Sequence, residues 1–227
     1  MKRFQVSCAN KIRYMPVAWL KTHPEYSLVV WKSMEEISDL LQNAALSRIE
    51  TLEWNSFKSE SRKREWLTAR NALQIILPGA NGSSIYYDKN GKPNLMDEGF
   101  ISISHSHEYI ALMKSYDPEI GIDIEIINER ILKLSQKFLN EKEKESVGSE
   151  NQLNKLHVMW GAKEVLYKIH SVGDLDFKKD LFVHPFEYKS SGELSASILK
   201  KGFQKDFKIF YEKIDQYMLS WSHSKAI

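Results

Sequence analysis

The chain has 227 residues, with 32 Lys and Arg against 30 Asp and Glu, so its formal net charge is only +2. Such a balance gives no support for a nucleic-acid partner, and the single Cys8 excludes an internal disulfide framework. No stretch approaches the ~20 apolar residues of a membrane span, and residues 1–20 have neither the apolar run nor the cleavage site of a signal peptide. We therefore expect a soluble cytoplasmic protein without membrane or nucleic-acid partners.

In chain order, the periodicity predicts a mixture of strands and helices. The first long helix is expected over 59–77, where an apolar face runs up to Pro78-Gly79. Turn signals follow at Asn81-Gly82 and Asn90-Gly91. The elements expected next are strands at 100–104 and 109–114, a break at Asp117-Pro118, helices at 130–147 and 152–170, and strands at 182–188, 194–199, 206–213 and 217–222, the last two joined at Asp215-Gln216. The break at Asp117-Pro118 divides the chain into predicted halves 1–117 and 118–227.

A pair of carboxylates stands out in the strand that follows this break. Read as a strand, GIDIEI at 121–126 places its isoleucines on one face and Asp123 and Glu125 on the other, ~6.5–7 Å apart. Neighbouring carboxylates repel unless a cation or a proton lies between them, and Glu164 would complete a three-carboxylate site. Mg²⁺ suits it, because Mg²⁺ takes oxygen ligands, keeps several waters and binds substrate phosphates. Alone, such a strand also fits the solvated face of a half-exposed sheet.

The expected helix 152–170 carries Glu164 on a polar row. Trp160, Glu164 and Lys168 are four residues apart and therefore share one side of the helix, apart from its apolar stripe. An acid and a lysine one turn apart also fit a plain surface pair worth ~0.3–0.5 kcal/mol. The metal interpretation depends on both elements occurring in this order in one chain.

Four sequence blocks resemble those of one family. They are KP at 92–93, ISISHS at 101–106, GIDIE at 121–125 and WGAKEVLYK at 160–168. The chain is similar to the 4′-phosphopantetheinyl transferases of the surfactin-synthetase-activating (Sfp) type, whose signature is Gly-[Ile/Val]-Asp-x-Glu followed some forty residues later by Trp-x-x-Lys-Glu-x-x-x-Lys. A Lys-Pro and a Ser-His precede these motifs in the family. Each block alone is weak, but four in register are specific.

The resemblance implies an α+β fold of two similar α/β halves that form a pseudo-dimer with a cleft between them. Each half is expected to hold a three-stranded antiparallel sheet and a long helix. The implied reaction is Mg²⁺-dependent transfer of 4′-phosphopantetheine from coenzyme A to a serine of an acyl or peptidyl carrier protein, with release of adenosine 3′,5′-bisphosphate. We also expect a monomer.

The resemblance also gives roles to the motif residues. Lys168 is expected to place its ammonium on the phosphates. Glu143, in the segment FLNEKE, is the candidate base for the serine, although it also fits an exposed acid in the charged run 141–145. The expected metal ligands are Asp123, Glu125 and Glu164.

The nucleotide end of coenzyme A is expected on the first half. Arg64 and Arg70 on the 59–77 helix are candidates for the 3′-phosphate and adenine, since a guanidinium presents a planar fork to phosphate. A solvated basic helix face is the alternative. The remaining expected contacts are Lys92 and Pro93 as a wall for adenine, Ser104 at the pyrophosphate, and His105 at the 3′-phosphate.

Some positions depart from the family pattern. Ser102 stands where the family usually has Asn, and Gly161 where it usually has a small hydroxyl or thiol residue. A mid-helix Gly costs roughly 1 kcal/mol relative to Ala. These departures bear on the shape of the cleft and on the choice of carrier.

Other functions stay open at this point. The carboxylates also fit another Mg²⁺-dependent enzyme acting on nucleotide phosphates, and the chain also fits a non-catalytic module that binds coenzyme A or a carrier protein. The sequence does not decide which carrier is modified, whether acyl-coenzyme A is accepted, or whether Mg²⁺ or Mn²⁺ is used.

Overall fold

The computed structural model describes residues 5–6, 13–14, 16–44, 46–79, 85–89, 91–96, 99–170 and 172–223. One antiparallel sheet has the strand order β3 (Val17–His23), β4 (Tyr26–Lys32), β8 (Tyr109–Ser115) and β7 (Phe100–Ser106). Three helices lie on one face of this sheet, namely α1 (Ile37–Ala44), α2 (Arg48–Ser56) and α3 (Glu60–Ile76). The second has the order β10 (Leu181–Val183), β11 (Ser191–Lys200), β12 (Phe203–Ile214), β13 (Tyr217–Ser222) and β9 (Gly121–Ile126), accompanied by α4 (Arg130–Phe138), α5 (Glu141–Val147) and α6 (Gln152–His170). Two short pairs are β1 (Gln5–Val6) with β2 (Arg13–Tyr14) and β5 (Ile85–Tyr87) with β6 (Pro93–Leu95).

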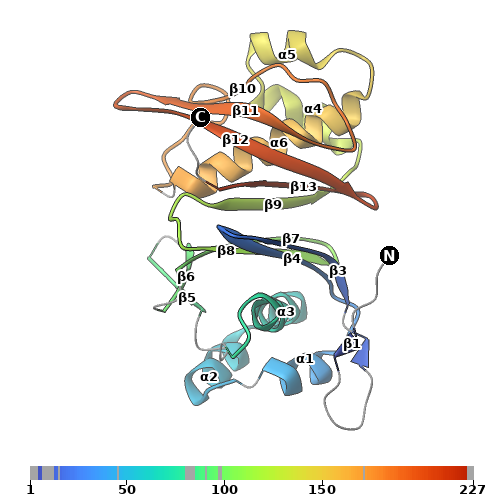
Figure 1. The fold of residues 1–227 in the computed structure, drawn as a ribbon, viewed down its shortest axis with the longest axis vertical. Helices are drawn as coiled ribbons and strands as arrows, with labels where there is room; N and C mark the ends of the chain where they lie inside the picture. Colours follow the sequence, from blue (N-terminus) through green and yellow to red (C-terminus); the bar gives the residue numbers. More distant parts are fainter. Residues whose placement is uncertain are drawn as a thin grey trace.

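The two larger sheets face each other, and their helices lie on the far sides (Figure 1). The core between the sheets is apolar and is contributed by the strands of both. Its buried members include Leu28 and Val30 on β4, Ala111 and Met113 on β8, Ile122 and Ile124 on β9, and Leu219 and Trp221 on β13. The predicted isoleucine face of β9 is therefore confirmed, and burial of this face turns Asp123 and Glu125 toward α6.

Strand β4, with the sequence YSLVVWK, is buried on both faces and therefore lacks a regular alternation of apolar and polar residues. Leu28 and Val30 point into the core between the sheets, whereas Val29 and Trp31 pack on the other face with Leu73 of α3. A strand buried on both faces reads as a continuous apolar run. Helix α3, predicted at 59–77, is confirmed at Glu60–Ile76, and the Ser59 side chain accepts a hydrogen bond from the N–H of Arg62 at its start.

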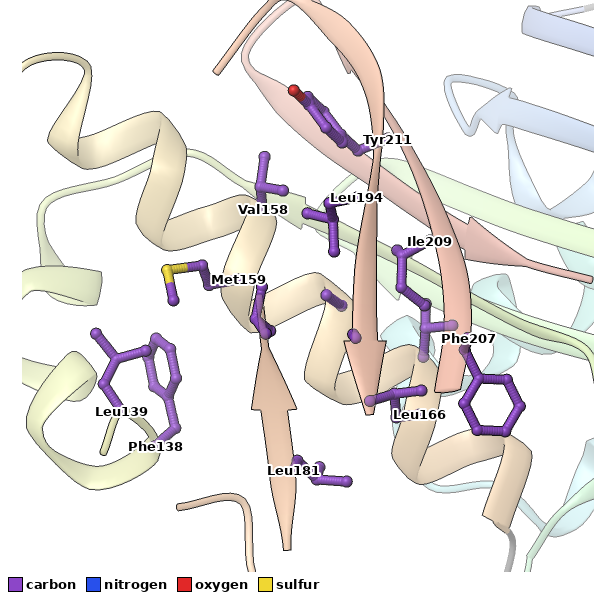
Figure 2. Packing of buried hydrophobic residues seen from close by; sticks show 14 of the residues in the cluster. Phe138, Leu139, Val158, Met159, Leu166, Leu181, Leu194, Phe207, Ile209 and Tyr211 are labelled. Atoms are coloured by element: carbon purple, nitrogen blue, oxygen red, sulfur yellow. The ribbon is translucent and has the colours of Figure 1, made fainter. Parts of the chain in front are cut away.

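The second sheet wraps around α6. Val158, Met159 and Leu166 of α6 belong to one buried cluster with Leu194 of β11 and Ile209 of β12 (Figure 2). This packing fixes the rotation of α6 about its axis and therefore the direction in which its polar row points. The prediction of a helix at 152–170 is confirmed.

Three predictions of secondary structure are wrong. The expected helix 130–147 is two helices, because Asn140 adopts an extended conformation and caps α5: its side chain accepts from the N–H of Glu143, whose carboxylate accepts from the N–H of Asn140. The strand expected at 182–188 ends at Val183, just before the segment with Pro185. Among the residues that the structure describes, the two larger sheets have four and five strands rather than three each.

The chain passes from the first sheet to the second between β8 and β9, across the predicted break at Asp117-Pro118. The division into halves 1–117 and 118–227, and a pseudo-twofold relation between them, stay predictions. The expected turn residues Asn81-Gly82 and Asn90 lie outside the described residues. None of the helices in the described part of the chain is long and apolar enough to cross a membrane.

Candidate active site

Two glycines let α6 lie directly against β9 and β13. A Cβ atom added to Gly161 would lie 2.5 Å from the Oγ of Ser220, and one added to Gly121 would lie 2.6 Å from the carbonyl oxygen of Val165. Both separations are too short for real side chains, so a larger residue at either position would push α6 away from the sheet. The close approach offsets the helix-propensity cost of Gly161 and brings the polar row of α6 to the carboxylates of β9.

Asp123 lies at the centre of this contact and is 3% exposed. Its Oδ1 accepts hydrogen bonds from the Oγ of Ser104 and the Nζ of Lys168, each at 2.8 Å. The Lys168 Nζ also donates to the carbonyl oxygen of Ile122 at 2.8 Å. The Oδ2 of Asp123 is buried and has no hydrogen-bond partner among the described residues. One oxygen of the carboxylate is therefore left for a ligand.

The surroundings of the other two carboxylates, Glu125 and Glu164, disfavour their ionised forms. Burial, together with the negative charges of Asp123 and Glu125, raises the pKa of Glu164 to about 7, and Lys168 only partly opposes this rise. Burial and Asp123 likewise raise the pKa of Glu125, against the hydrogen bond from Ser106 and the charge of Lys168. Three acids thus share one neighbouring ammonium. An added cation would relieve their repulsion.

The residues fit a hard divalent cation such as Mg²⁺. All candidate ligand atoms of Asp123, Glu125 and Glu164 are carboxylate oxygens, and the buried Oδ2 of Asp123 has no other partner among the described residues. In the part of the chain that the structure describes, these three residues do not form a set whose ligand atoms all lie within 4.8 Å of one another. Side-chain rotations would be needed for all three to hold one cation, and three carboxylate ligands would leave the rest of an octahedral shell to water and substrate oxygens, as Mg²⁺ prefers.

Two serines of β7 hold β9 in place, and neither was expected to have a role. Strand β9 ends its sheet, so the N–H groups on its outer edge have no partner strand there. The N–H of Ile122 donates to the Oγ of Ser102 at 3.1 Å, and that of Ile126 donates to the Oγ of Ser106 at 3.2 Å. Ser106 in turn donates to Glu125 at 3.2 Å. The period-two spacing of the serines in ISISHS places them on one face of β7 but does not identify β9 as their partner.

A cavity of about 330 Å³ opens beside Glu164 and Lys168. Lys92 and Pro93 line its other side, so the structure brings these four predicted residues together although they come from β6, its preceding turn and α6. Partial burial lowers the pKa of Lys92, and the charge of Asp88 opposes this change. The remaining lining comes from Gly91, Ile101, Ser102, Ile103, Tyr167 and Gly173.

A second cavity, of about 520 Å³, opens on the other side of the carboxylates, beside Glu125. Its wall carries Trp160 of α6 and three cations of α4, which are Arg130, Lys133 and Lys137. The carboxylates therefore lie between two cavities. Glu164 belongs to the first and Glu125 to the second.

Arg70 does not fit the predicted role at the nucleotide. Its side chain is fully buried, its Nε donates to the Oε1 of Glu50 at 2.9 Å, and its guanidinium lies 3.1 Å from the ring centroid of Trp66. Burial lowers the pKa of Arg70, which the hydrogen bond and charge of Glu50 oppose. A guanidinium held in this way between α2 and α3 forms a structural ion pair, which argues against contact with a nucleotide, and that contact stays a prediction to be tested by substitution.

Glu143 does not fit the predicted role of a base. It is 1% exposed, and its oxygens accept from Lys163 Nζ at 2.7 Å, from the N–H of Val183 at 2.8 Å and from the N–H of Asn140 at 2.9 Å. The Lys163 Nζ also donates to the carbonyl oxygen of Phe138 at 2.7 Å. A carboxylate with these partners joins α5, α6 and β10, and this burial argues against the role of a base, which stays a prediction.

Arg64 lies on α3, and His105 of β7 lies beside that helix. The Arg64 guanidinium donates to the carbonyl oxygen of Glu35, just before α1. His105 is half exposed, and its Nε2 lies 3.5 Å from a carboxylate oxygen of Glu65 on α3. Contacts of these two side chains with a nucleotide stay predictions.

Buried carboxylates beside a lysine, with a cavity on either side, define a protein that can hold a hard cation next to an anionic ligand. Residues 119–222 match the sequence profile of the 4′-phosphopantetheinyl transferase superfamily. The chain is 34% identical over 92 residues to a holo-[acyl-carrier-protein] synthase of Staphylococcus haemolyticus, a match that covers 77% of that protein and 34% of this chain. The chain belongs to the 4′-phosphopantetheinyl transferase superfamily.

Two further relatives each match a little under half of the chain. The 4′-phosphopantetheinyl transferase AcpT of Escherichia coli O157:H7 is 33% identical over 114 residues, which are 47% of this chain and 57% of that protein. The 4′-phosphopantetheinyl transferase gsp of Aneurinibacillus migulanus is 32% identical over 110 residues, which are 46% of this chain and 45% of that protein. The chain thus spans about half the length of these two curated relatives.

Proposed function

We propose that the protein transfers 4′-phosphopantetheine from coenzyme A to a serine hydroxyl of an acyl or peptidyl carrier protein, and that it is of the Sfp type. The observation that carries the proposal is the buried, unpartnered Oδ2 of Asp123 among the described residues, on a carboxylate whose other oxygen binds Lys168, within the segment that matches the superfamily. The Sfp-type assignment is supported by the β5–β6 pair, because Lys92, just before β6, and Pro93, its first residue, line the same cavity as Glu164.

The two cavities suggest how coenzyme A lies in the site. Asp123, Glu125 and Glu164 would hold Mg²⁺, which when bound neutralises charge on pyrophosphate oxygens. The pyrophosphate then lies between the cavities, and the two ends of coenzyme A leave it in opposite directions. We assign the nucleotide end to the cavity with Lys92 and Pro93, and the pantetheine arm and the carrier serine to the cavity beside Glu125.

Lys168 is the cation that this chain itself places at the phosphates. In the reaction the serine oxygen forms a bond to the phosphorus that bears the pantetheine arm, and the bond from that phosphorus to the bridging oxygen of the nucleotide breaks. The departing bisphosphate gains negative charge. Asp123 and the carbonyl oxygen of Ile122 hold the Lys168 ammonium in advance, so little reorganisation is needed when the charge develops.

The proton of the carrier serine needs an acceptor other than Glu143. That carboxylate is enclosed by Lys163 and by backbone N–H groups. We assign the proton to water in the cavity beside Glu125. Trp160 and the cations of α4 line this cavity, and it is large enough to hold several water molecules.

Intact mass spectrometry of apo carrier proteins tests the proposal. Carriers of the fatty-acid, polyketide and nonribosomal-peptide kinds are incubated with the protein, coenzyme A and Mg²⁺. At least one carrier should gain the mass of a single phosphopantetheine, and replacing its acceptor serine by alanine should abolish the gain. Asp123→Ala should remove most of the activity, whereas the exposed Glu187→Gln should not. A broad panel without any modified carrier would refute the proposal.

A further inference from the structure

Two histidines and a glutamate meet where the two sheets come together, away from the carboxylates of β9. His23 ends β3, Glu25 lies in the turn before β4, and His223 follows the end of β13. The first two belong to the sheet with α3, and the third belongs to the sheet with α6. The cluster therefore joins residues that are 200 positions apart in the sequence and that lie on different sheets.

The three ligand atoms are close to metal-binding geometry. The Nδ1 of His223 lies 3.2 Å from the Oε2 of Glu25, and the Nδ1 of His23 lies 3.9 Å from the same oxygen. All three atoms lie within 4.8 Å of one another. Ligands bound tetrahedrally to Zn²⁺ are separated by ~3.3 Å, since each lies ~2.0–2.1 Å from the ion. Small side-chain rotations would close the set around a metal.

Neighbouring groups already orient the ligands. The N–H of Glu25 lies 3.3 Å from the Nδ1 of His23 and can only donate, so this nitrogen is unprotonated, and a metal bound there would replace this hydrogen bond at its lone pair. The imidazole of His223 stacks on Phe210 with centroids 5.5 Å apart and an interplanar angle of 7°, and it also contacts Tyr26. Tyr26 in turn stacks on His23 at 4.9 Å. Supporting contacts of this kind fix the direction of metal ligands.

We propose that His23, Glu25 and His223 bind one Zn²⁺ ion or a similar divalent transition metal, with water at the open position. Two imidazole nitrogens and one carboxylate suit Zn²⁺, whereas Mg²⁺ prefers oxygen ligands throughout. The ion would join the β3–β4 turn of one sheet to the end of the last strand of the other. This site shares no residue with the carboxylates, so it can be tested whether or not the transferase proposal holds.

Zinc titration of the full chain in excess Mg²⁺ tests the inference, because Mg²⁺ competes at the oxygen site and not at imidazoles. The wild type should bind one equivalent of Zn²⁺ under these conditions, and so should Asp123→Asn, in which the carboxylate site is altered. His223→Gln and His23→Gln should each weaken zinc binding by at least about tenfold, since even supporting residues change metal affinity by that factor. His184→Gln is the matched control, because its ring contacts Ser197 at 2.8 Å and Phe182 and takes no part in the cluster.

Two further measurements separate metal binding from a plain ion pair. Zn²⁺ should raise the thermal midpoint of the wild type and of His184→Gln, but not that of His23→Gln, whose side chain is exposed enough to be replaced without unfolding the protein. Co²⁺ bound in place of Zn²⁺ should give visible absorption that the His23 variant lacks. Equal zinc affinity in the wild type and both cluster variants, or no zinc binding at all, would overturn the inference and leave Glu25 and His223 as an ion pair.

Discussion

Replacing Glu164 by glutamine should stabilise the metal-free protein, because it removes a charge that the fold disfavours. The pKa of Glu164 rises from 4.5 to about 7 through burial and through repulsion by Asp123 and Glu125. This rise corresponds to about 3 kcal/mol of destabilisation of the ionised side chain, since each pKa step of one is worth about 1.4 kcal/mol. Glutamine has nearly the same shape and carries no charge.

The sign of the effect depends on pH. A group whose pKa is higher in the folded state contributes stability below its unfolded pKa of 4.5, and this contribution is lost as the pH rises through about 7. At pH 8 the variant should therefore exceed the wild type by about 3 kcal/mol in the free energy of unfolding. At pH 5 the difference should fall below about 1 kcal/mol, because Glu164 is then largely protonated in the folded wild type.

Urea unfolding in the presence of a chelator, at pH 5 and pH 8, measures both differences. Glu187→Gln is the control, because this exposed acid lies away from the carboxylates of β9. At pH 8 the Glu164 variant should also melt roughly 6–12 °C higher. Added Mg²⁺ should stabilise the wild type and the control more than the Glu164 variant. A variant that is less stable than the wild type at pH 8, or a difference that does not change with pH, would refute the reasoning.

Three further variants distinguish residues that stabilise the fold from residues that act in binding or catalysis. Arg70→Leu leaves Glu50 buried without its partner, so urea unfolding should show a loss of about 3–5 kcal/mol; a stable variant with weakened coenzyme A binding would restore the predicted role at the nucleotide. Glu143→Gln should lose stability in the same way because Lys163 stays buried, whereas its folded fraction should keep its turnover in the carrier assay; lost turnover at normal stability would point back to a base. His105→Ala should weaken coenzyme A binding by roughly ten- to a hundredfold in calorimetry, as expected for a charge-assisted contact. Its affinity for dephospho-coenzyme A should not change, and an equal loss for both ligands would contradict the assignment to the 3′-phosphate.

The strand and the helix that carry the carboxylates could be predicted, because the patterns that indicate them involve residues close together in the sequence. The isoleucine alternation of β9 and the apolar stripe of α6 depend on residues within a few positions of one another. These patterns placed Asp123 on one strand face and Glu164 on one helix face. The packing of α6 on β9 then brings the two acids together, as their order in the chain had suggested.

The buried ion pairs could not be predicted, because each depends on a partner outside the local pattern. Arg70 lies one turn from Trp66 and Leu73, which is compatible either with the rim of a ligand site or with the protein core. The choice depends on Glu50, which lies on another helix, 20 positions earlier in the sequence. Lys163 and Glu143 are likewise 20 positions apart, and each is buried only because the other is present.

The contact between β7 and β9 also could not be predicted from the sequence. Ser102 and Ser106 satisfy N–H groups at the edge of a strand in the other sheet, a relation that no periodicity within one strand can encode. An edge strand with open N–H groups would otherwise need another partner. Ser106 does both tasks, since it accepts from the backbone of β9 and donates to Glu125.

The same packing gives a physical reason for the glycine at position 161. The family usually has a small hydroxyl or thiol side chain there, but here Ser220, which pairs with Asp123 across β13 and β9, takes that space with its own hydroxyl. A Cβ at position 161 would lie 3.0 Å from the Cβ of Ser220 as well as 2.5 Å from its Oγ, and 3.8 Å from the Oδ2 of Asp123. The chain therefore supplies a polar group beside the carboxylates from the strand rather than from the helix. The two positions are coupled through volume, because a side chain at position 161 and the hydroxyl of Ser220 would occupy the same space.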